Sequence, residues 1–138
     1  MALLRLAEEK DIPQIKKIAD ADKKCLGFIS RAWLGASIAK EELHIAVLDG
    51  EVVGFIRWHK RRDGMITIYD LCVAERFRRK NIGQQLVSVL GDSYLRLKCH
   101  QDNPARDFYK RLGFEVVGLE TSKGGRKLNI FERNNVPF

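Results

Sequence analysis

A basic loop that leads into a glycine-containing helix start is the part of this chain best suited to bind a ligand. Four of the five residues between positions 76 and 80 are basic, namely Arg76, Arg78, Arg79 and Lys80. Asn81, Ile82 and Gly83 follow directly, and an apolar helical pattern begins there. A helix N-terminus leaves backbone N–H groups without helical partners and carries a partial positive charge. The segment therefore predicts a site for a phosphate or pyrophosphate.

The net charge of the chain agrees with an anionic ligand. Its 138 residues suit one compact domain, which we expect to span positions 1–138, and its net charge is +7. Such a charge attracts nucleotide-like cofactors, nucleic acids or acidic proteins. No apolar run approaches the ~18 residues of a membrane helix, and the N-terminus turns acidic too early for a secretory signal. We therefore expect a cytoplasmic protein that does not enter a membrane.

The cysteines give no sign of a disulfide framework or of a metal site. Cys25, Cys72 and Cys99 are odd in number and widely spaced, and no C-x-x-C pair occurs. We interpret all three as small, reduced core residues, and we expect no bound metal.

The order of strand and helix patterns predicts the frame around the basic loop. We expect strands over residues 3–6, 43–48, 52–58, 65–73, 94–99, 115–120 and 127–132, and helices after Asp11, from Ser30, from Gly83 to about Asp92 and after Asn103. This order, β-α-α-β-β-β-α-β-α-β-β, indicates an α/β fold with a mixed sheet of about seven strands and helices on both faces. Strands joined by hairpins are expected to pair antiparallel, and the two strands joined by the β-α-β crossover are expected to be parallel.

Local signals mark several ends of these elements. Asp11 is expected to cap the first helix, with Gln14 at the capping-box position. Asp49-Gly50 is typical of a tight hairpin turn. Gly113 is expected to end the helix that Asn103 begins.

Two segments together resemble the motifs of the GNAT superfamily of acetyl-CoA-dependent N-acetyltransferases. Residues 78–83, RRKNIG, are similar to the family's loop Arg/Gln-x-x-Gly-x-Gly/Ala. Residues 103–114, NPARDFYKRLGF, are similar to its N-x-x-A-x-x-F-Y-x-x-x-G-F signature, shortened by one residue. The order of elements also resembles the family across the whole chain. Asn81 replaces the first loop glycine, and because Asn tolerates positive φ better than most residues, we expect the turn to be kept.

The resemblance implies acetyl-CoA as cosubstrate, with its pyrophosphate on the backbone N–H groups between Arg79 and Gln84. It also implies that the end of the central strand pairs with the pantetheine amide, and that an N–H there could stabilise an oxyanion. The implied cofactor-binding residues are Leu71, Cys72, Val73, Arg78, Arg79, Lys80, Asn81, Ile82, Gly83, Gln84 and Asn103. The alternative is that the charges are solvated surface residues and that Gly83 is a turn glycine.

Tyr109 is the first catalytic candidate. The resemblance implies that it lies near the sulfur and protonates the leaving thiolate. Because a free tyrosine has a pKa of about 10 and a thiol one of about 8.5, hydrogen-bond donation to the developing S⁻ could be sufficient. The alternative is a core aromatic residue beside Phe108.

The attacking amine must lose a proton, and Asp70 on the central strand is the candidate acceptor. Strand alternation places Tyr69 and Leu71 on the opposite face from Asp70. A buried or paired structural carboxylate is the favoured alternative for Asp70, and Glu42, Glu51 or water are further options for the base. The three histidines are scattered along the chain and form no evident constellation.

The sequence thus predicts an N-acetyltransferase in which a primary amine attacks acetyl-CoA directly through a tetrahedral intermediate. The acceptor could be a small molecule, a protein or an aminoacyl-tRNA, and the resemblance allows a homodimer. The acceptor groove is expected between the early helices and the final hairpin, with Phe28, Trp33, Trp58 and Phe131 as lining or core residues. The alternatives are a basic nucleic-acid-binding module and a CoA-binding sensor without turnover.

Overall fold

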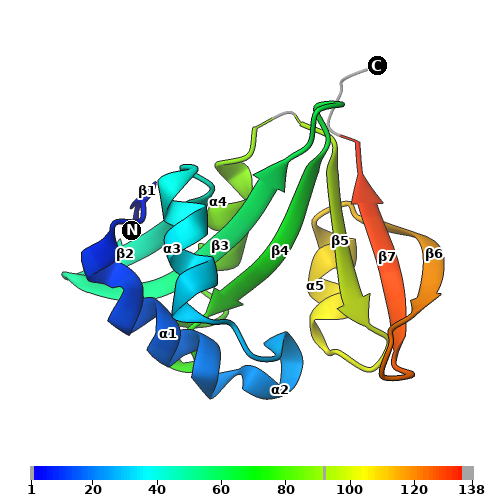
Figure 1. The fold of residues 1–138 in the computed structure, drawn as a ribbon, viewed down its shortest axis with the longest axis horizontal. Coiled ribbons are helices and arrows are strands. Elements are labelled where there is room, and N and C mark those ends of the chain that lie inside the picture. Colours follow the sequence, from blue (N-terminus) through cyan, green and yellow to red (C-terminus); the bar gives the residue numbers. More distant parts are fainter. Residues whose placement is uncertain (1, 92, 135–138) are drawn as a thin grey trace. The chain divides into compact units, whose positions relative to one another are not determined.

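Seven strands form one mixed sheet in the order β1-β2-β3-β4-β5-β7-β6, which confirms the predicted α/β class (Figure 1). The computed structural model describes residues 2–91 and 93–134. The chain divides into two compact units: unit 1 comprises Met1–His59 and Tyr69–Gly91, and unit 2 comprises Lys60–Ile68 and Asp92–Phe138. The strand β4 (Ile66–Val73) passes from unit 2 into unit 1.

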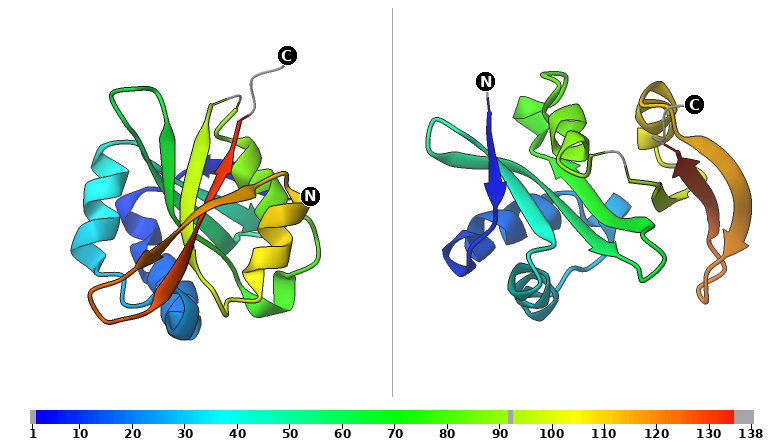
Figure 2. Two further views of the ribbon diagram at one scale, coloured as in Figure 1. Left: turned by 90° about the vertical axis from the view of Figure 1, so that its right-hand side faces the viewer. Right: turned by 90° about the horizontal axis from the view of Figure 1, so that it is seen from above.

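Unit 1 is built on antiparallel strands with helices on both faces. Its strands β1 (Leu3–Leu6), β2 (Leu43–Leu48) and β3 (Glu51–Lys60) pair in sequence order. The helices α1 (Ile12–Ala21) and α3 (Arg31–Ala39) cover one face, and α4 (Ile82–Ser88) covers the other (Figure 2). A short helix, α2 (Lys23–Leu26), and 3-10 turns over Glu9–Asp11 and Glu75–Phe77 were not predicted.

The two faces of unit 1 are packed differently. Apolar side chains from α1, α3 and the sheet form the core on one face, including Ile15, Leu34, Ile45 and Phe55, all fully buried. On the other face, a Cβ on Gly54 of β3 would lie 3.2 Å from Leu86 Cδ1 of α4 and 3.0 Å from Cys72 O of β4. Only glycine fits there without displacing a neighbour.

The turn between β2 and β3 follows the sequence prediction. Asp49 and Gly50 both have positive φ, 50° and 78°, which is the conformation that a two-residue hairpin requires. This turn sets the register of the two strands.

Unit 2 combines a parallel pair of strands with an antiparallel hairpin. Its strand β5 (Leu95–His100) pairs in parallel with the first residues of β4 and antiparallel with β7 (Lys127–Arg133). The strand β6 (Glu115–Thr121) pairs with β7, and the helix α5 (Ala105–Arg111) packs its Tyr109 ring against Phe131 of β7. Gly113 has a φ of 92° directly after α5, which confirms it as the stop of that helix.

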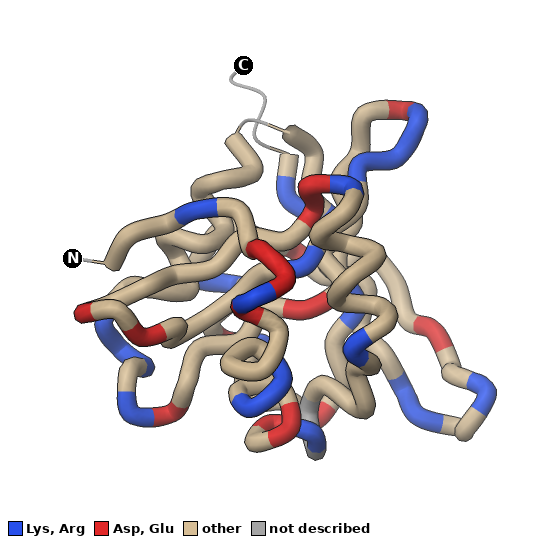
Figure 3. The backbone as a smooth tube through the Cα atoms, turned by 60° about the vertical axis from the view of Figure 1, so that its left-hand side comes forward, with Lys and Arg blue, Asp and Glu red and all other residues tan. Residues whose placement is uncertain are grey.

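The loop between β4 and α4 carries the basic run. Figure 3 shows that lysines and arginines also occur in many other parts of the chain, several of them next to acidic residues. The helix α4 begins at Ile82 and ends at Ser88, so it is shorter than predicted; the predicted end at Asp92 lies outside the described residues.

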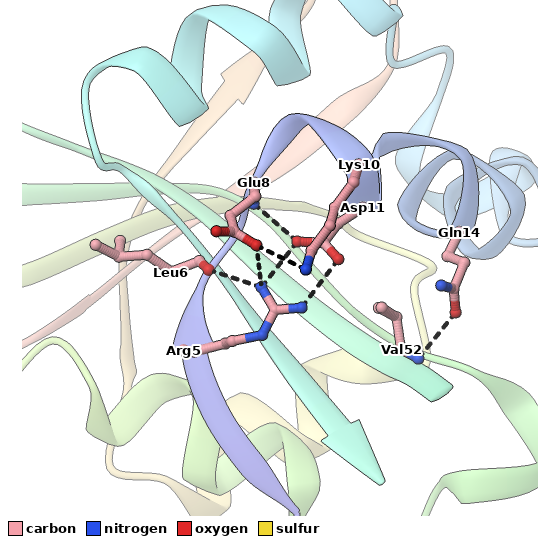
Figure 4. A network of polar contacts seen from close by, with 7 residues as sticks. All are labelled: Arg5, Leu6, Glu8, Lys10, Asp11, Gln14 and Val52. Atoms are coloured by element: carbon pink, nitrogen blue, oxygen red, sulfur yellow. Dashed lines mark hydrogen bonds and ion pairs between the residues drawn. The ribbon is translucent and has the colours of Figure 1, made fainter. Parts of the chain in front are cut away.

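The predicted capping box at the start of α1 is wrong (Figure 4). The Asp11 carboxylate accepts the Glu8 N–H at 2.8 Å and both Arg5 nitrogens at 2.8 and 3.0 Å instead of capping α1. Gln14 Oε1 accepts the Val52 N–H of β3 at 3.0 Å. A bidentate arginine offers the carboxylate two parallel charge-assisted bonds, whereas a helix N-terminus offers it backbone N–H groups alone. Arg5 lies on β1, and the local helix pattern did not predict its pairing with Asp11.

Among the described residues, no helix is both long enough and apolar enough to cross a membrane. Cys72 and Cys99 are buried, which agrees with their prediction as core residues. The Cys25 side chain lies outside the described part of the chain.

Candidate functional site

The basic loop is exposed and ends in a left-handed turn at the start of α4. Arg76, Arg78, Arg79 and Lys80 are all exposed. Asn81, the N-cap residue of α4, has φ 64° and ψ 13° and makes no side-chain bond to the helix. The expectation that Asn keeps the positive-φ turn in place of glycine is therefore confirmed.

The backbone at this turn is arranged to meet an anion. The first helical bond runs from the Gln85 N–H to Asn81 O at 3.0 Å, so the amides of residues 82–84 precede the helical ladder. A left-handed residue followed by a right-handed one also turns successive N–H groups toward a common point, which can accept an oxyanion. Arg79 shares the left-handed conformation at φ 65°, which no sequence signal distinguished from its basic neighbours.

Two of the arginines bind the loop to other residues of unit 1. Arg78 Nε donates to Val73 O at 2.9 Å, and its Nη2 lies 3.4 Å from Asp22 Oδ2. Arg76 forms an ion pair with Glu51. The sequence treated Arg78 as a phosphate ligand, whereas its guanidinium here contacts the end of β4.

The end of β4 combines a buried thiol with backbone groups. Cys72 is buried, and Leu71 and Val73 on either side are half-buried. Cys72 Sγ donates to Asp22 Oδ2 at 3.6 Å, and burial together with that carboxylate raises the pKa of Cys72 to about 12. Cys72 therefore stays a neutral thiol and is unsuited to act as a nucleophile.

Asp70 lies on the buried face of β4, paired with Arg57 of β3. Arg57 Nε donates to Asp70 Oδ2 at 2.6 Å, and the two side chains are only 14% and 7% exposed. Burial raises the pKa of Asp70, and the charge of Arg57 opposes that rise. Tyr69 is exposed, as alternation predicts. Asp70 is thus a buried, paired carboxylate, which is the alternative that the sequence analysis preferred to a catalytic role.

Aromatic rings flank the same arginine. The guanidinium carbon of Arg57 lies 5.8 Å from the centre of the Trp33 ring and 4.9 Å from that of Tyr69. Both rings are large and open to solvent, with Trp33 54% and Tyr69 50% exposed. Of the four aromatic residues considered for the groove, Phe28 is also exposed, and Phe131 is fully buried in the core of unit 2.

A histidine and a glutamate meet beside Tyr69. The rings of His59 and Tyr69 are stacked, with centres 6.4 Å apart and planes within 6°. His59 Nδ1 lies 2.9 and 3.1 Å from the two Glu42 oxygens. The sequence analysis missed this pair. The Asp49-Gly50 turn offered a signal, since counting back along both strands from that turn places residue 42 near residues 58 and 59.

The other histidines have different partners. His44 Nδ1 accepts the Trp58 indole N–H at 3.2 Å, and burial lowers the pKa of His44, so it is a neutral acceptor. His100 Nε2 lies 3.0 Å from Arg126 Nη1 in unit 2.

Tyr109 and Asn103 lie in unit 2. The Tyr109 ring is buried among Phe108, Phe114 and Phe131, with ring centres 5.5, 5.8 and 5.9 Å away. Asn103 Oδ1 accepts the Ala105 N–H at 2.9 Å, but the N-cap residue of α5 is Pro104, one residue later than predicted. Their roles toward a cofactor remain predictions.

The comparisons with known proteins identify the family. Residues 13–129 match the model of the acetyltransferase (GNAT) domain. The chain is 30% identical over 141 residues to the 5-NmdU N-acetyltransferase of Pseudomonas phage PaMx11, covering 96% of this chain and 99% of the relative. Among solved structures, Ard1 from Thermoplasma volcanium has a TM-score of 0.88 at 23% identity, with 99% of each chain covered. The PaiA N-acetyltransferase of Thermoplasma acidophilum, solved in complex with coenzyme A, has a TM-score of 0.79 at 20% identity, with 97% of this chain and 99% of that chain covered. The chain therefore belongs to the GNAT acetyltransferase family and is an N-acetyltransferase.

Proposed function

We propose that the protein transfers the acetyl group of acetyl-CoA to a primary amine. The observation that carries this proposal is the exposed basic loop that ends in the left-handed turn at Asn81 and leads into α4. Backbone amides at that turn would hold the pyrophosphate. The proposed cradle comprises Arg79, Lys80, Asn81, Ile82, Gly83 and Gln84, with Arg78 bracing the loop against Val73.

In the proposed reaction the amine nitrogen attacks the thioester carbonyl directly. A C–N bond forms, the carbonyl oxygen becomes an oxyanion, and collapse of the tetrahedral intermediate breaks the C–S bond. Backbone N–H groups at the end of β4, around Leu71 to Val73, would stabilise the oxyanion. The thiolate that leaves would receive a hydrogen bond or proton from Tyr109, and Asn103 would contact the pantetheine arm.

The proton released by the amine needs an acceptor, and the contacts in unit 1 favour His59 over Asp70. Asp70 is buried and bound by Arg57, so it is already engaged in holding that side chain. His59 is 39% exposed, and Glu42 fixes one of its nitrogens. An imidazole is a suitable base near neutral pH. We propose that His59 receives the proton while Glu42 orients its ring.

The acceptor is proposed from the phage relative. That protein is named a 5-NmdU N-acetyltransferase, and it is matched over almost the full length of both chains. We take 5-NmdU as the first acceptor to test, beside peptides with a free N-terminal amine.

Cofactor binding is tested by thermal shift with acetyl-CoA at several hundred micromolar. A rise in Tm is expected for the wild-type protein. Gly83→Glu should abolish the rise, because a carboxylate would occupy the position proposed for the pyrophosphate. Gly35→Glu is the matched control, since Gly35 is also helical and a Cβ there meets nothing within 4 Å. Retained binding in Gly83→Glu would place the phosphates elsewhere.

Two further outcomes separate the alternatives. A rise in Tm with nucleic acid but none with acetyl-CoA would support a nucleic-acid-binding module. A rise with acetyl-CoA without thiol release on any amine would support a CoA-binding sensor.

The catalytic roles are tested by kinetics. Tyr109→Phe should lower kcat by about 10²-fold or more while the affinity for acetyl-CoA is unchanged, because the ring is kept and only the donor is lost. His59→Gln should lower kcat by a similar factor. Unchanged turnover in Tyr109→Phe would mean that Tyr109 only packs against its aromatic neighbours.

A further inference from the structure

Two exposed aromatic rings lie close to one guanidinium in unit 1, with the Arg57 Cζ 5.8 Å from the centre of the Trp33 ring and 4.9 Å from that of Tyr69. We call Trp33, Arg57 and Tyr69 the stacking surface. We propose that this surface binds the acceptor by stacking on a planar nucleobase that carries the reacting amine. The inference rests on the proposed acetyl transfer and names the class of its acceptor.

The stacking surface is rigidly supported. Arg57 is fixed by Asp70 beneath it, at 2.6 Å. The Trp33 backbone is fixed in the first turn of α3, where its N–H donates to the Ser30 hydroxyl of the N-cap at 3.0 Å. Aromatic rings that are held in place before binding lose little conformational freedom when a ligand stacks on them.

The ring of Tyr69 is contacted by two neighbouring side chains. His59 stacks against it almost in parallel, and Arg57 lies 4.9 Å from its centre. Half of Tyr69 nevertheless remains accessible. A base that stacked here would lie near His59, the proposed acceptor of the amine proton.

The chemistry of the stacking surface favours a base over a peptide N-terminus. Both acceptors present an amine, so the amine itself does not distinguish them, and the two carboxylates nearby, Asp70 and Glu42, are paired with Arg57 and His59. A nucleobase also gains from a flat π-surface, which Trp33 and Tyr69 supply, and from an adjacent cation, whereas a peptide N-terminus has no ring to stack. A nucleoside acceptor such as 5-NmdU would offer such a ring.

The charge of the chain adds a second argument. At a net charge of +7, the protein attracts a phosphate-bearing strand as well as a nucleotide cofactor. Aromatic and basic residues are not interleaved along the chain, because Trp33, Arg57 and Tyr69 come from three separate elements and meet only in the fold.

The test compares acetyl transfer by the wild-type protein with that by Trp33→Ala and Tyr69→Ala. The acceptor is 5-NmdU, supplied as the free nucleoside and within a single-stranded oligodeoxynucleotide. Each variant should raise the acceptor KM by about 5- to 100-fold, the range expected for loss of one stacking contact. The KM for acetyl-CoA should stay unchanged. Trp33→Phe and Tyr69→Phe should restore most of the acceptor affinity, because they restore a ring.

Leu3→Ala is the matched control. Leu3 lies in the same unit and is exposed to a similar degree, but it belongs to β1. It should leave both KM values unchanged. A larger effect of the alanine variants on the oligonucleotide than on the nucleoside would assign the acceptor to a strand, and an equal effect would assign it to the free nucleoside; both support the surface.

A binding experiment gives a readout apart from turnover. Titration of the wild-type protein with 5-NmdU should quench the fluorescence of Trp33, and Trp33→Phe should remove that quenching while Trp58 remains as the reporter of folding. Wild-type KM in both alanine variants would overturn the stacking surface. Acetylation of peptide N-termini but not of 5-NmdU would overturn it as well while leaving acetyl transfer intact. Failure of acetyl-CoA to bind or react with any amine would overturn the proposed function, and this inference with it.

Discussion

Unit 1 contains two buried aspartates that are each paired with an arginine, and their carboxyl groups respond to the fold in opposite ways. Asp11 accepts two bonds from Arg5 and one from the Glu8 N–H, and these bonds, Arg5 above all, hold its pKa below the usual value (Figure 4). Asp70 is bound by Arg57 Nε, and burial raises its pKa in spite of that charge. At Asp70 the effect of burial exceeds that of its arginine, whereas at Asp11 the bonds from Arg5 exceed the effect of burial, so the presence of an arginine does not by itself decide which form is favoured.

The two pairs also serve different parts of the molecule. The Arg5–Asp11 pair joins β1 to the turn before α1, and its arginine is 32% exposed. The Arg57–Asp70 pair lies beneath the stacking surface, and its arginine is 14% exposed. One pair fixes the path of the chain, and the other fixes the guanidinium that we propose to bind the acceptor. Substitutions in each pair should therefore separate stability from function.

Arg57→Met should have the largest effect. It leaves Asp70 as a buried carboxylate without its partner, and the loss of one member of a buried pair costs about 3–5 kcal/mol in the free energy of unfolding. The cost should shrink at acidic pH, where Asp70 can take up a proton. Urea denaturation at pH 7 and pH 5 measures both values.

Arg5→Met is the control for Arg57→Met. Arg5 is more exposed, and Asp11 keeps the bond from the Glu8 N–H. It should therefore destabilise the protein less. Equal losses in the two variants would mean that the difference in burial has no energetic consequence.

Asp11→Asn should have an intermediate effect, a loss of about 2 kcal/mol at pH 7, because hydrogen bonds to a charged group are replaced by weaker ones. The folded-state pKa of Asp11 is lowered, so its contribution is complete above the ordinary pKa of an aspartate and is lost as the pH falls through the folded value. The two unfolding curves should therefore converge in acid. A difference that stays constant from pH 7 to pH 2 would contradict the role given to ionised Asp11. Acetyl transfer should be unchanged at pH 7.

The distance along the chain between interacting residues explains which features could be predicted from the sequence. The Asp49-Gly50 turn, the start of a helix at about Ser30 and the positive φ of Asn81 depend on neighbours within a few residues, and all three were predicted. The partner of Gln14 is Val52, 38 residues away, and the pairing of His59 with Glu42 spans 17 residues. Such partners depend on the strand register, and local sequence patterns limit the possible registers without selecting one. The family motifs predict a cofactor loop because that proposed role depends on backbone in one continuous segment, whereas the proposed stacking surface is assembled from three elements.

Asp70→Asn should have the smallest effect on stability, within about 1 kcal/mol at pH 7, because burial already disfavours the ionised carboxylate and an amide oxygen can still accept the Arg57 N–H. Its pH trend should be opposite to that of Asp11→Asn. A raised folded-state pKa means that the folded protein holds the Asp70 proton more tightly, so this contribution to stability is complete below the ordinary aspartate pKa and declines as the pH rises through the folded value. The deficit of the variant should therefore be larger in acid than at neutral pH, as urea denaturation across that range would show.

The same Asp70→Asn variant decides whether Asp70 positions Arg57 or accepts the proton of the amine. If Asp70 positions Arg57, kcat should change by less than about threefold, since the amide keeps the hydrogen bond, and any loss should fall on the acceptor KM. If Asp70 accepts the proton, kcat should fall by about 10²-fold or more with the acceptor KM unchanged. Arg57→Lys sharpens the distinction, because a lysine keeps the charge beside Asp70 but lacks the planar group that lies close to the Trp33 and Tyr69 rings. A raised acceptor KM in Arg57→Lys, together with a nearly normal kcat in Asp70→Asn, would place the pair in acceptor binding and leave the chemistry to His59 and Tyr109.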